Sequence, residues 1–543
     1  MKVRKFWGWG FLDQVLTKEE EASVENRITQ NFNLDEVKAI PIPLAKEIDL
    51  PKPKIETPQA LEKVLSADHL ERLNHSYGKS FPDVARAMLG SFPHPPDLVA
   101  FPTNQAEVVS IVDWADQNNV AVIPYGGGSS VCGGVETDVG GSYSGVISLD
   151  LRNLNRVLEI DKESRAARIQ AGIFGPALEE ELKKSNLTLR HFPQSFEHST
   201  LGGWIATRSG GHFATLYTHI DDFVESTTMV TPTGVIESRR LPGSGAGPSP
   251  DRMVIGSEGI LGVITEAWMR LQEKPSFRAS CPVLFDDYDK ALNATRLISQ
   301  SALFPANCRL LDANEALFNG AGDGSKNLLI LSFESADHEM DTWLNRALEI
   351  ASDEGGQFEI PQEKKVDAHK SGASGTWRNS FIRAPYYREA SVRRGVIQDT
   401  FETSITWDKG FEFIEILKEK AAEAIKEISG KESTVTCRLT HTYPDGLAPY
   451  FSYSAYATPS TMIDVWKEIK LMTNEMCVSA GGTVTHHHAV GRDHRIKGYD
   501  LQRPEGFKDM LVAAKQGVDP KSIMNPGVLV DPKGFKHKHW MDT

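Results

Sequence analysis

Apolar positions along this chain switch between two spacings, and the switches mark the predicted elements. After Asn104, a residue type that caps helices, apolar residues recur at helical spacing over residues 105–115. Residues 120–124, 146–149 and 166–173 are short apolar runs of strand length. Helices and strands therefore alternate in this part of the chain.

Later stretches continue the mixture. Residues 176–184 predict a helix, because Pro176 occupies the first position and glutamates precede lysines along it. Residues 223–231 form a strand-like run, and the turn residues Thr231 to Gly234 follow it. The fold class predicted from these patterns is α+β.

Changes of character along the chain predict several domains. At 543 residues the chain is too long for one hydrophobic core. We expect a helical N-terminal region, a first domain, a second domain of mixed helix and strand, and a helical C-terminal segment that returns to the first domain: residues 1–92, 93–275, 276–495 and 496–543.

Composition excludes some classes of protein. Hydrophobic residues make up 40% and charged residues 24% of the chain, which is ordinary for a globular protein and argues against long disorder. The formal net charge is −14, whereas a nucleic-acid-binding surface is basic. We therefore expect no nucleic-acid partner, although a local basic pocket for one phosphate remains compatible with this charge.

The cysteines and the chain ends predict a cytoplasmic location. Five cysteines are scattered without a CxxC pair or a disulfide-like rhythm, which is typical of a reducing compartment. The residues after the basic start, Phe6 to Gly10, do not form the apolar region of a signal peptide. The last residues, Trp540 to Thr543, contain no peroxisomal tripeptide.

A glycine-rich loop is the first candidate for chemistry. Three glycines and two serines follow the strand-like run that ends at Pro124 and Tyr125. Successive glycines expose several backbone N–H groups in one concavity, which suits a pyrophosphate. The loop is neither a dinucleotide fingerprint, because Val131 replaces the third glycine, nor a nucleotide P-loop, because no Lys and Ser/Thr pair follows Gly133. A tight turn without a ligand is the alternative.

Two more polar, glycine-bearing segments follow, around Gln194 to Gly210 and Ile255 to Thr265. The three segments together resemble the vanillyl-alcohol-oxidase type of FAD-binding domain, over about Pro95 to Pro275. The resemblance implies a two-subdomain FAD-binding domain followed by a mixed α/β cap domain that holds the substrate. It also implies that the following residues contact FAD: Pro124, Tyr125, Gly126, Gly127, Gly128, Ser129, Ser130, Gln194, Ser195, Phe196, Glu197, His198, Ser199, Thr200, Thr207, Arg208, Ser209, Gly210, Glu258, Gly259, Ile260, Leu261, Gly262, Val263 and Ile264.

The mode of FAD binding follows from one residue type. Many members of this family hold the flavin covalently through a histidine in or near the glycine loop. Residues Tyr125 to Ser130 contain no histidine. We therefore expect non-covalent FAD.

Motifs in the second half narrow the family. These motifs are Cys308 to Asp312, Pro385 to Glu389 with Phe401 to Asp408, Cys437 to Tyr453, and Gly481 to Gly491. With Trp7 to Gly10 and His191 to Phe196, they resemble the alkylglycerone-phosphate synthases (alkyl-dihydroxyacetone-phosphate synthases). The resemblance implies that an acyl-dihydroxyacetone phosphate exchanges its acyl group for a fatty alcohol with no net oxidation, giving an ether-lipid precursor.

Site residues follow by motif position, each with an alternative. The resemblance gives Tyr450 the proton transfers, Arg388 the substrate phosphate and Arg309 a supporting role, with His486, His487 and His488 completing the catalytic pocket. Arg388 offers the planar fork that suits a phosphate, but it could also form a structural ion pair. Tyr450 as a base needs nearby cations, and a hydrogen-bonded core tyrosine is the alternative.

The histidine triplet raises the question of a metal. In a strand, His486 and His488 would share one face and His487 the other. No CxxC or HExxH motif accompanies them, so we expect no metal and favour histidines that titrate beside flavin and phosphate.

Two other functions stay open, together with two expectations about partners. An FAD-dependent 2-hydroxyacid dehydrogenase would use the same arginine for a carboxylate, and the ending Met524 to Gly527 resembles such enzymes. An FAD-binding subunit without its own catalysis is disfavoured by Tyr450 and the histidines. We also expect a homodimer and peripheral contact with a membrane.

Overall fold

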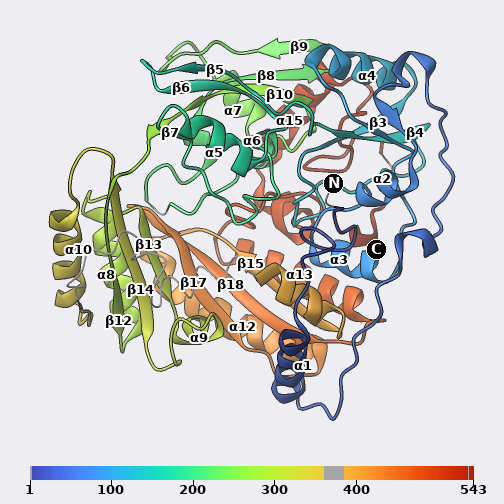
Figure 1. Cartoon of the computed structure of the whole chain (residues 1–543). Coiled ribbons are helices and arrows are strands. Elements are labelled where there is room, and N and C mark those ends of the chain that lie inside the picture. Colours follow the sequence, from blue (N-terminus) through green and yellow to red (C-terminus); the bar gives the residue numbers. More distant parts are fainter. Residues whose placement is uncertain (1–2, 214, 360–383, 533, 536, 543) are drawn as a thin grey trace.

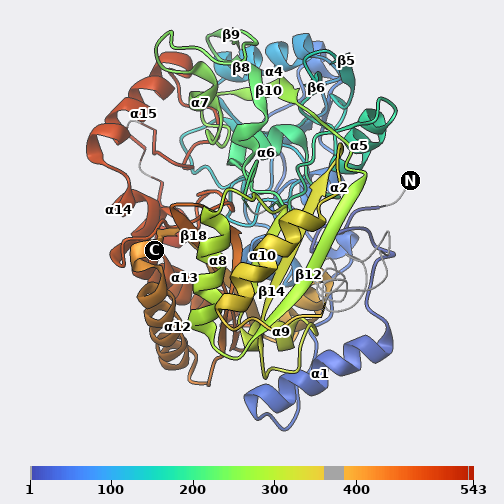
Figure 2. The same ribbon diagram turned by 90° about the vertical axis from the view of Figure 1, so that its left-hand side faces the viewer.

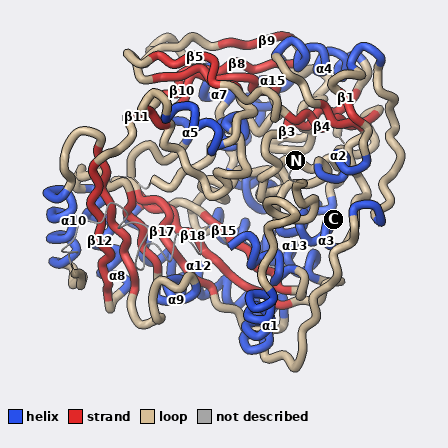
Figure 3. The backbone as a smooth tube through the Cα atoms, in the orientation of Figure 1, coloured by secondary structure: helices blue, strands red, loops and turns tan. Residues whose placement is uncertain are grey.

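The computed structural model describes residues 3–213, 215–359, 384–532, 534–535 and 537–542. Two sheet-containing halves lie one above the other in Figure 1, with the first domain above and the second below. Most of the backbone between them is loop (Figure 3). Within the described part of the chain, the helices are all too short or too polar to cross a bilayer.

The first domain contains a small sheet that carries the glycine loop. Its strand order is β1 (Leu65–Ser66), β2 (Leu98–Ala100), β4 (Gly145–Asp150) and β3 (Val120–Tyr125), and β2, β4 and β3 are parallel. Helix α4 (Gln105–Gln117) precedes β3. The predicted cap is confirmed, because the side chain of Asn104 accepts a hydrogen bond of 3.0 Å from the amide of Glu107.

A second, antiparallel sheet completes this domain. Its strand order is β5 (Val157–Asp161), β6 (Ala166–Gln170), β10 (Val263–Arg270), β8 (Val224–Thr231) and β9 (Gly234–Glu237). The helices packed with it are α5 (Gly175–Lys183), α6 (Leu201–Thr207) and α7 (Pro250–Val254), and β7 (Leu187–Thr188) pairs with β11 (Gln272–Glu273).

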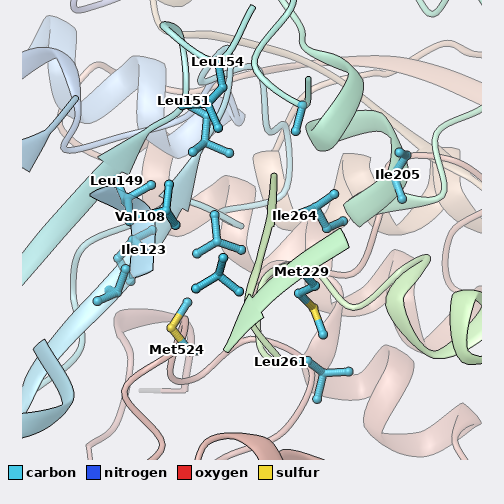
Figure 4. Packing of buried hydrophobic residues seen from close by; sticks show 14 of the residues in the cluster. Val108, Ile123, Leu149, Leu151, Leu154, Ile205, Met229, Leu261, Ile264 and Met524 are labelled. Atoms are coloured by element: carbon cyan, nitrogen blue, oxygen red, sulfur yellow. The ribbon is translucent and has the colours of Figure 1, made fainter. Parts of the chain in front are cut away.

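The two sheets share one hydrophobic core. Ile123 and Leu149 of the first sheet pack with Met229 and Ile264 of the second, as Figure 4 shows. Met524, from the end of the chain, belongs to the same cluster. The apolar runs of the sequence therefore meet in one core although they come from both ends of the domain.

The second domain is an antiparallel sheet with helices packed against it. Its antiparallel sheet has the strand order β12 (Phe277–Phe285), β14 (Asn327–Ser335), β13 (Asn307–Leu311), β17 (Val435–Thr442), β18 (Gly446–Tyr456) and β15 (Val396–Glu402), and β16 (Ile405–Thr406) pairs with β18. The accompanying helices are α8 (Tyr288–Gln300), α9 (Ala313–Phe318), α10 (Asp341–Asp353), α12 (Trp407–Ser429) and α13 (Met462–Ser479).

The pleat of this sheet separates two environments. Helices α8 and α10 lie across β12 and β14 in Figure 2. Leu329 and Leu331 of β14 belong to the hydrophobic core on that side of the sheet. Side chains of opposite parity, such as Arg309 and Tyr450, face away from that core, because successive residues of a strand alternate.

Both chain ends contact both domains. Strand β1 pairs with β2 of the first domain, whereas Val24 packs with Val396 of the second domain and Met541 belongs to the second domain's core. The N-terminal part contains α1 (Lys18–Phe32), α2 (His69–Asn74), α3 (Phe81–Met88) and strand β1. The sequence predicted a helical region, and the structure adds a strand to it. The C-terminal segment contains α14 (Asp500–Gln502) and α15 (Glu505–Val518). After α15 the chain is extended instead of helical, because Ile523 and Asn525 exchange backbone hydrogen bonds with Val122 of β3.

Candidate functional site

A cavity of about 2090 Å³ opens between the glycine loop and the sheet of the second domain, here called the cap sheet, on the face that is turned away from the helices. Small-molecule sites usually measure ~300–1,000 Å³. The cavity therefore has room for a large cofactor and a second ligand together.

The glycine loop leaves β3 and lines this cavity. Its glycines are required by close packing, because a Cβ on Gly126 would overlap the side chain of Thr200, and a Cβ on Gly127 would overlap the backbone of His198. Among the described residues, we find no protein acceptor for the amides of residues 126–130. A row of free amides beside a cavity is a nest for an anion.

The predicted cofactor segments converge on the same cavity, with three exceptions. Arg208 turns away, and its guanidinium pairs with Asp221 at 2.9 Å. Ile260 and Leu261 are buried in the core of the first domain. All the other predicted cofactor-binding residues line the cavity, and this list names them in chain order: Pro124, Tyr125, Gly126, Gly127, Gly128, Ser129, Ser130, Gln194, Ser195, Phe196, Glu197, His198, Ser199, Thr200, Thr207, Ser209, Gly210, Glu258, Gly259, Gly262, Val263 and Ile264.

Glu258 joins the first domain to the histidine segment. Its carboxylate accepts hydrogen bonds from the amides of Val490 at 2.8 Å and Gly491 at 2.7 Å. Burial raises the pKa of Glu258 to about 7, and these two amides oppose that rise. Asn525 adds to the junction by donating to the carbonyl oxygen of Glu258 at 2.7 Å. These contacts fix the end of the histidine segment against the predicted cofactor site.

Across the cavity, three strands place polar side chains in one row. Tyr450 of β18 is the register partner of both Arg438 on β17 and Glu402 on β15. All three side chains are buried. The cap sheet thus presents a phenol between a guanidinium and a carboxylate.

Tyr450 is the central member of this row. The guanidinium of Arg438 lies 3.9 Å from the centre of its ring, and Arg438 also pairs with Glu315. Burial raises the pKa of Tyr450, although Arg438 opposes the rise. The phenol therefore keeps its proton at neutral pH and is suited to donate it, while a proton acceptor has to come from another group.

The two predicted substrate arginines both line the cavity, in different settings. Arg309 is buried on β13, and burial, together with Arg438, lowers its pKa to about 9. Arg388 lies on a helical turn of residues 384–392, where its Nε donates to the carbonyl oxygen of Gln398 at 2.9 Å. Its guanidinium also lies 3.4 Å from Asp399, so an anionic ligand at Arg388 has to share it with a carboxylate.

The histidine triplet lies in a turn instead of a strand, so the strand-face argument does not apply. Glu402 determines this geometry, because the amides of His486, His487 and His488 all donate to its Oε1, at 3.0, 2.9 and 2.9 Å. His487 and His488 line the cavity. His486 lies behind them and contacts Tyr443 at 2.7 Å, so this predicted catalytic residue is not a cavity wall.

Some of these side chains have the geometry of metal ligands. Ligand atoms of His441, His486 and His487 lie within 4.8 Å of one another, as do those of Glu402, His487 and His488. However, Nδ1 of His487 is 2.6 Å from Glu402 Oε2 and 3.1 Å from Nδ1 of His486. These distances are those of polar groups in direct contact with each other, so we assign no ion to the cluster.

Glu402 and Arg438 lie within the sequence motifs that carry the family resemblance, but neither residue was predicted to have a role in the site. A signal for Arg438 is present, because Thr436, Arg438 and Thr440 alternate with apolar residues in a short run, which places them on the polar face of a strand. Glu402 carries no such local signal, since its partners lie more than eighty residues away.

Comparisons with known proteins identify the family of the two domains. Residues 96–238 match the family model described as FAD binding domain, and residues 274–529 match FAD linked oxidases, C-terminal domain. The chain is 31% identical to alkyldihydroxyacetonephosphate synthase of Dictyostelium discoideum, over 96% of this chain and 87% of that protein. It is 30% identical to the Trypanosoma brucei brucei protein of that name, over 89% and 82% of the two chains. A solved structure of alkyldihydroxyacetonephosphate synthase superposes with a TM-score of 0.78 at 26% identity, covering 96% of this chain and 98% of that one.

Proposed function

Because the chain belongs to the FAD-binding family of the alkyldihydroxyacetonephosphate synthases, we propose that it is an alkyl transferase that forms an ether bond. In this reaction an acyl-dihydroxyacetone phosphate and a long-chain alcohol give the alkyl ether and a fatty acid. The carbon–oxygen bond to the acyl group breaks, and one to the alcohol oxygen forms. No electron acceptor is consumed. Identity of about 30% across both domains is the observation that carries this proposal.

The residues of the first domain fit FAD. The free amides of residues 126–130 suit its pyrophosphate, and the segments around Thr200 and Gly259 would hold the rest of the molecule against the cavity wall. Bound FAD would supply an electron-accepting ring at which the substrate carbon is activated. Residues Tyr125 to Ser130 contain no histidine, which supports non-covalent binding.

The cap would hold and protonate the substrate. We assign the phosphate to Arg388 with support from Arg309, because both guanidiniums line the cavity. We assign proton donation to Tyr450, which is buried and keeps its proton. The protein would work in a reducing compartment such as the cytoplasm, which its five free cysteines support.

The reaction is tested by supplying acyl-dihydroxyacetone phosphate and hexadecanol without oxygen or any electron acceptor. We expect many turnovers per flavin. Tyr450→Phe should keep its FAD and lose about 10²–10⁴-fold in rate, the usual contribution of a general acid or base. Tyr456→Phe is the matched control, because Tyr456 lies on the same strand but packs against Phe32.

A different outcome would favour the alternative enzyme. If product formation consumes an acceptor in equal amount, the transferase is excluded. Reduction of the flavin by a 2-hydroxyacid alone would then identify a dehydrogenase.

A further inference from the structure

Glu402 occupies an anion site that the protein itself builds. Three successive amides, from His486 to His488, converge on its Oε1, and the hydroxyl of Thr485 donates to the same oxygen at 2.6 Å. Such a concavity of N–H groups ordinarily holds a phosphate or carboxylate. Since Glu402 fills it, this turn does not bind the substrate phosphate and has another use.

The second carboxylate oxygen meets a ring of the triplet. Oε2 of Glu402 lies 2.6 Å from Nδ1 of His487. Burial alone would raise the pKa of Glu402, but His487 beside it holds that pKa well below its ordinary value. A carboxylate only accepts hydrogen bonds, so the approach of Glu402 Oε2 favours a proton on Nδ1 of His487.

A second argument for a proton on Nδ1 of His487 comes from three contacting histidines, His219, His486 and His487. The carbonyl oxygen of Arg208 lies 3.0 Å from Nδ1 of His219, which must therefore carry a proton. Nε2 of His219 then accepts from Nε2 of His486 at 3.2 Å, and the Tyr443 hydroxyl oxygen, 2.7 Å from the same nitrogen, shares that proton. Nδ1 of His486 accepts from Nδ1 of His487 at 3.1 Å. Burial lowers the pKa of both His219 and His486, so each is neutral and has one donor and one acceptor nitrogen.

Building on the proposed function, we infer that Glu402 is a positioning residue that fixes the tautomer of His487 and makes Nε2 of His487 the proton acceptor of the site. His487 lines the cavity, and its ring stacks on Tyr450 with 6.0 Å between centroids. The site then has a proton acceptor that is distinct from the protonated phenol of Tyr450.

The proton balance of the reaction requires such an acceptor. The alcohol loses its hydroxyl proton when its oxygen bonds to the substrate carbon, and the fatty acid leaves as a carboxylate. His487 accepts the alcohol proton at Nε2 and afterwards releases it to solvent, so one proton leaves per turnover and no electrons are exchanged.

The variant Glu402→Gln separates this role from a structural one. Its carbonyl oxygen can still accept from the three amides, but its NH₂ group faces Nδ1 of His487 and favours the opposite tautomer. We expect kcat and kcat/KM to fall together by about a hundredfold or more, with normal KM and FAD content. Glu412→Gln is the matched control, because Glu412 is exposed on α12, and it should stay near wild type. Wild-type activity in Glu402→Gln would overturn the inference.

A second measurement is independent of substrate and of the variant Glu402→Gln. The holoprotein with ¹⁵N-labelled histidines is examined by NMR at neutral pH, and His487 is assigned from the signals lost in His487→Asn. We expect a protonated Nδ1 and an unprotonated Nε2. The reverse tautomer would refute the role of Glu402 even if alkyl transfer is demonstrated, whereas the expected tautomer without alkyl transfer would count against the proposed reaction only.

Discussion

Arg388 is held by groups of the protein itself, and a phosphate has to displace or share them. Its Nε contacts the carbonyl oxygen of Gln398 at 2.9 Å, and its other nitrogens lie 3.4 Å from Asp399 and from the carbonyl oxygen of Lys79. The two longer contacts are at the limit of hydrogen bonding. They are weak enough for a dianion to replace.

The substitution Arg388→Lys keeps the charge but removes the fork. A charge-assisted hydrogen bond contributes ~1.5–3 kcal/mol, so its loss should weaken apparent substrate affinity by about ten- to a hundredfold. FAD content should be unchanged. The measurement is KM for the phosphate-bearing substrate together with flavin absorbance.

Arg393→Lys is the control for this prediction. Arg393 lies just after the helical turn that carries Arg388. It contacts Glu21 at 3.4 Å and the carbonyl oxygen of Ile40, and it does not line the cavity. If Arg388→Lys loses flavin as well as affinity, or if both variants behave alike, Arg388 is a structural residue.

At the scale of elements, the segment from Arg4 to Phe11 crosses the glycine loop like a strap. Arg4 donates to the carbonyl oxygen of Gly127 at 3.3 Å, and the rings of Trp9 and Phe11 lie 5.9 and 6.5 Å from His198. Lys5 pairs with Glu389 at 2.9 Å, next to Arg388. One short segment thus touches both the predicted cofactor loop and the substrate arginine's helix.

Removing the charged contact of this strap should loosen FAD. Arg4→Ala loses a hydrogen bond from a charged donor, so we expect FAD to bind about ten times more weakly or worse. The readout is flavin retained after extensive dialysis. Wild-type protein should retain its flavin on dialysis and release all of it on acid precipitation.

Lys18→Ala serves as the comparison, because Lys18 begins α1 and is exposed there. Equal retention of FAD in Arg4→Ala and Lys18→Ala would show that the strap does not contribute to cofactor binding.

For the whole molecule, buried neutral histidines predict sensitivity to acid. Burial lowers the pKa of His191 and of His494 to about 3, and that of His198 and His488 to about 4. In the unfolded chain each would titrate near ~6.5. Between these values the unfolded state binds more protons, so stability is present above pH ~6.5 and is lost as pH falls.

The variant His191→Gln tests this prediction at one position. His191 is buried and contacts Ser209 at 2.8 Å, and glutamine keeps a polar group there without a titrating proton. The slope of unfolding free energy against pH, measured by denaturation between about pH 6 and 5, should decrease by about 1.4 kcal/mol per pH unit. A slope equal to wild type in His191→Gln would contradict the prediction.

The sequence by itself determined the parts of this protein that depend on consecutive residues. The cap at Asn104 and the amide-rich glycine loop are recognisable in the sequence, because capping and the exposure of successive amides follow from neighbouring residue types. The FAD-binding domain and its cap were predicted because the glycine loop and the two glycine-bearing segments after it, in this order, resemble the vanillyl-alcohol-oxidase family.

Only the tertiary structure decided which side chains meet. Strand register placed Arg438 and Glu402 beside Tyr450, and loop packing brought Glu402 under a histidine turn more than eighty residues away. The same packing turned Arg208, Ile260 and Leu261 away from the cavity and moved His486 behind its neighbours. These outcomes depend on burial across the whole sheet and between domains, and no short stretch of sequence contains that information.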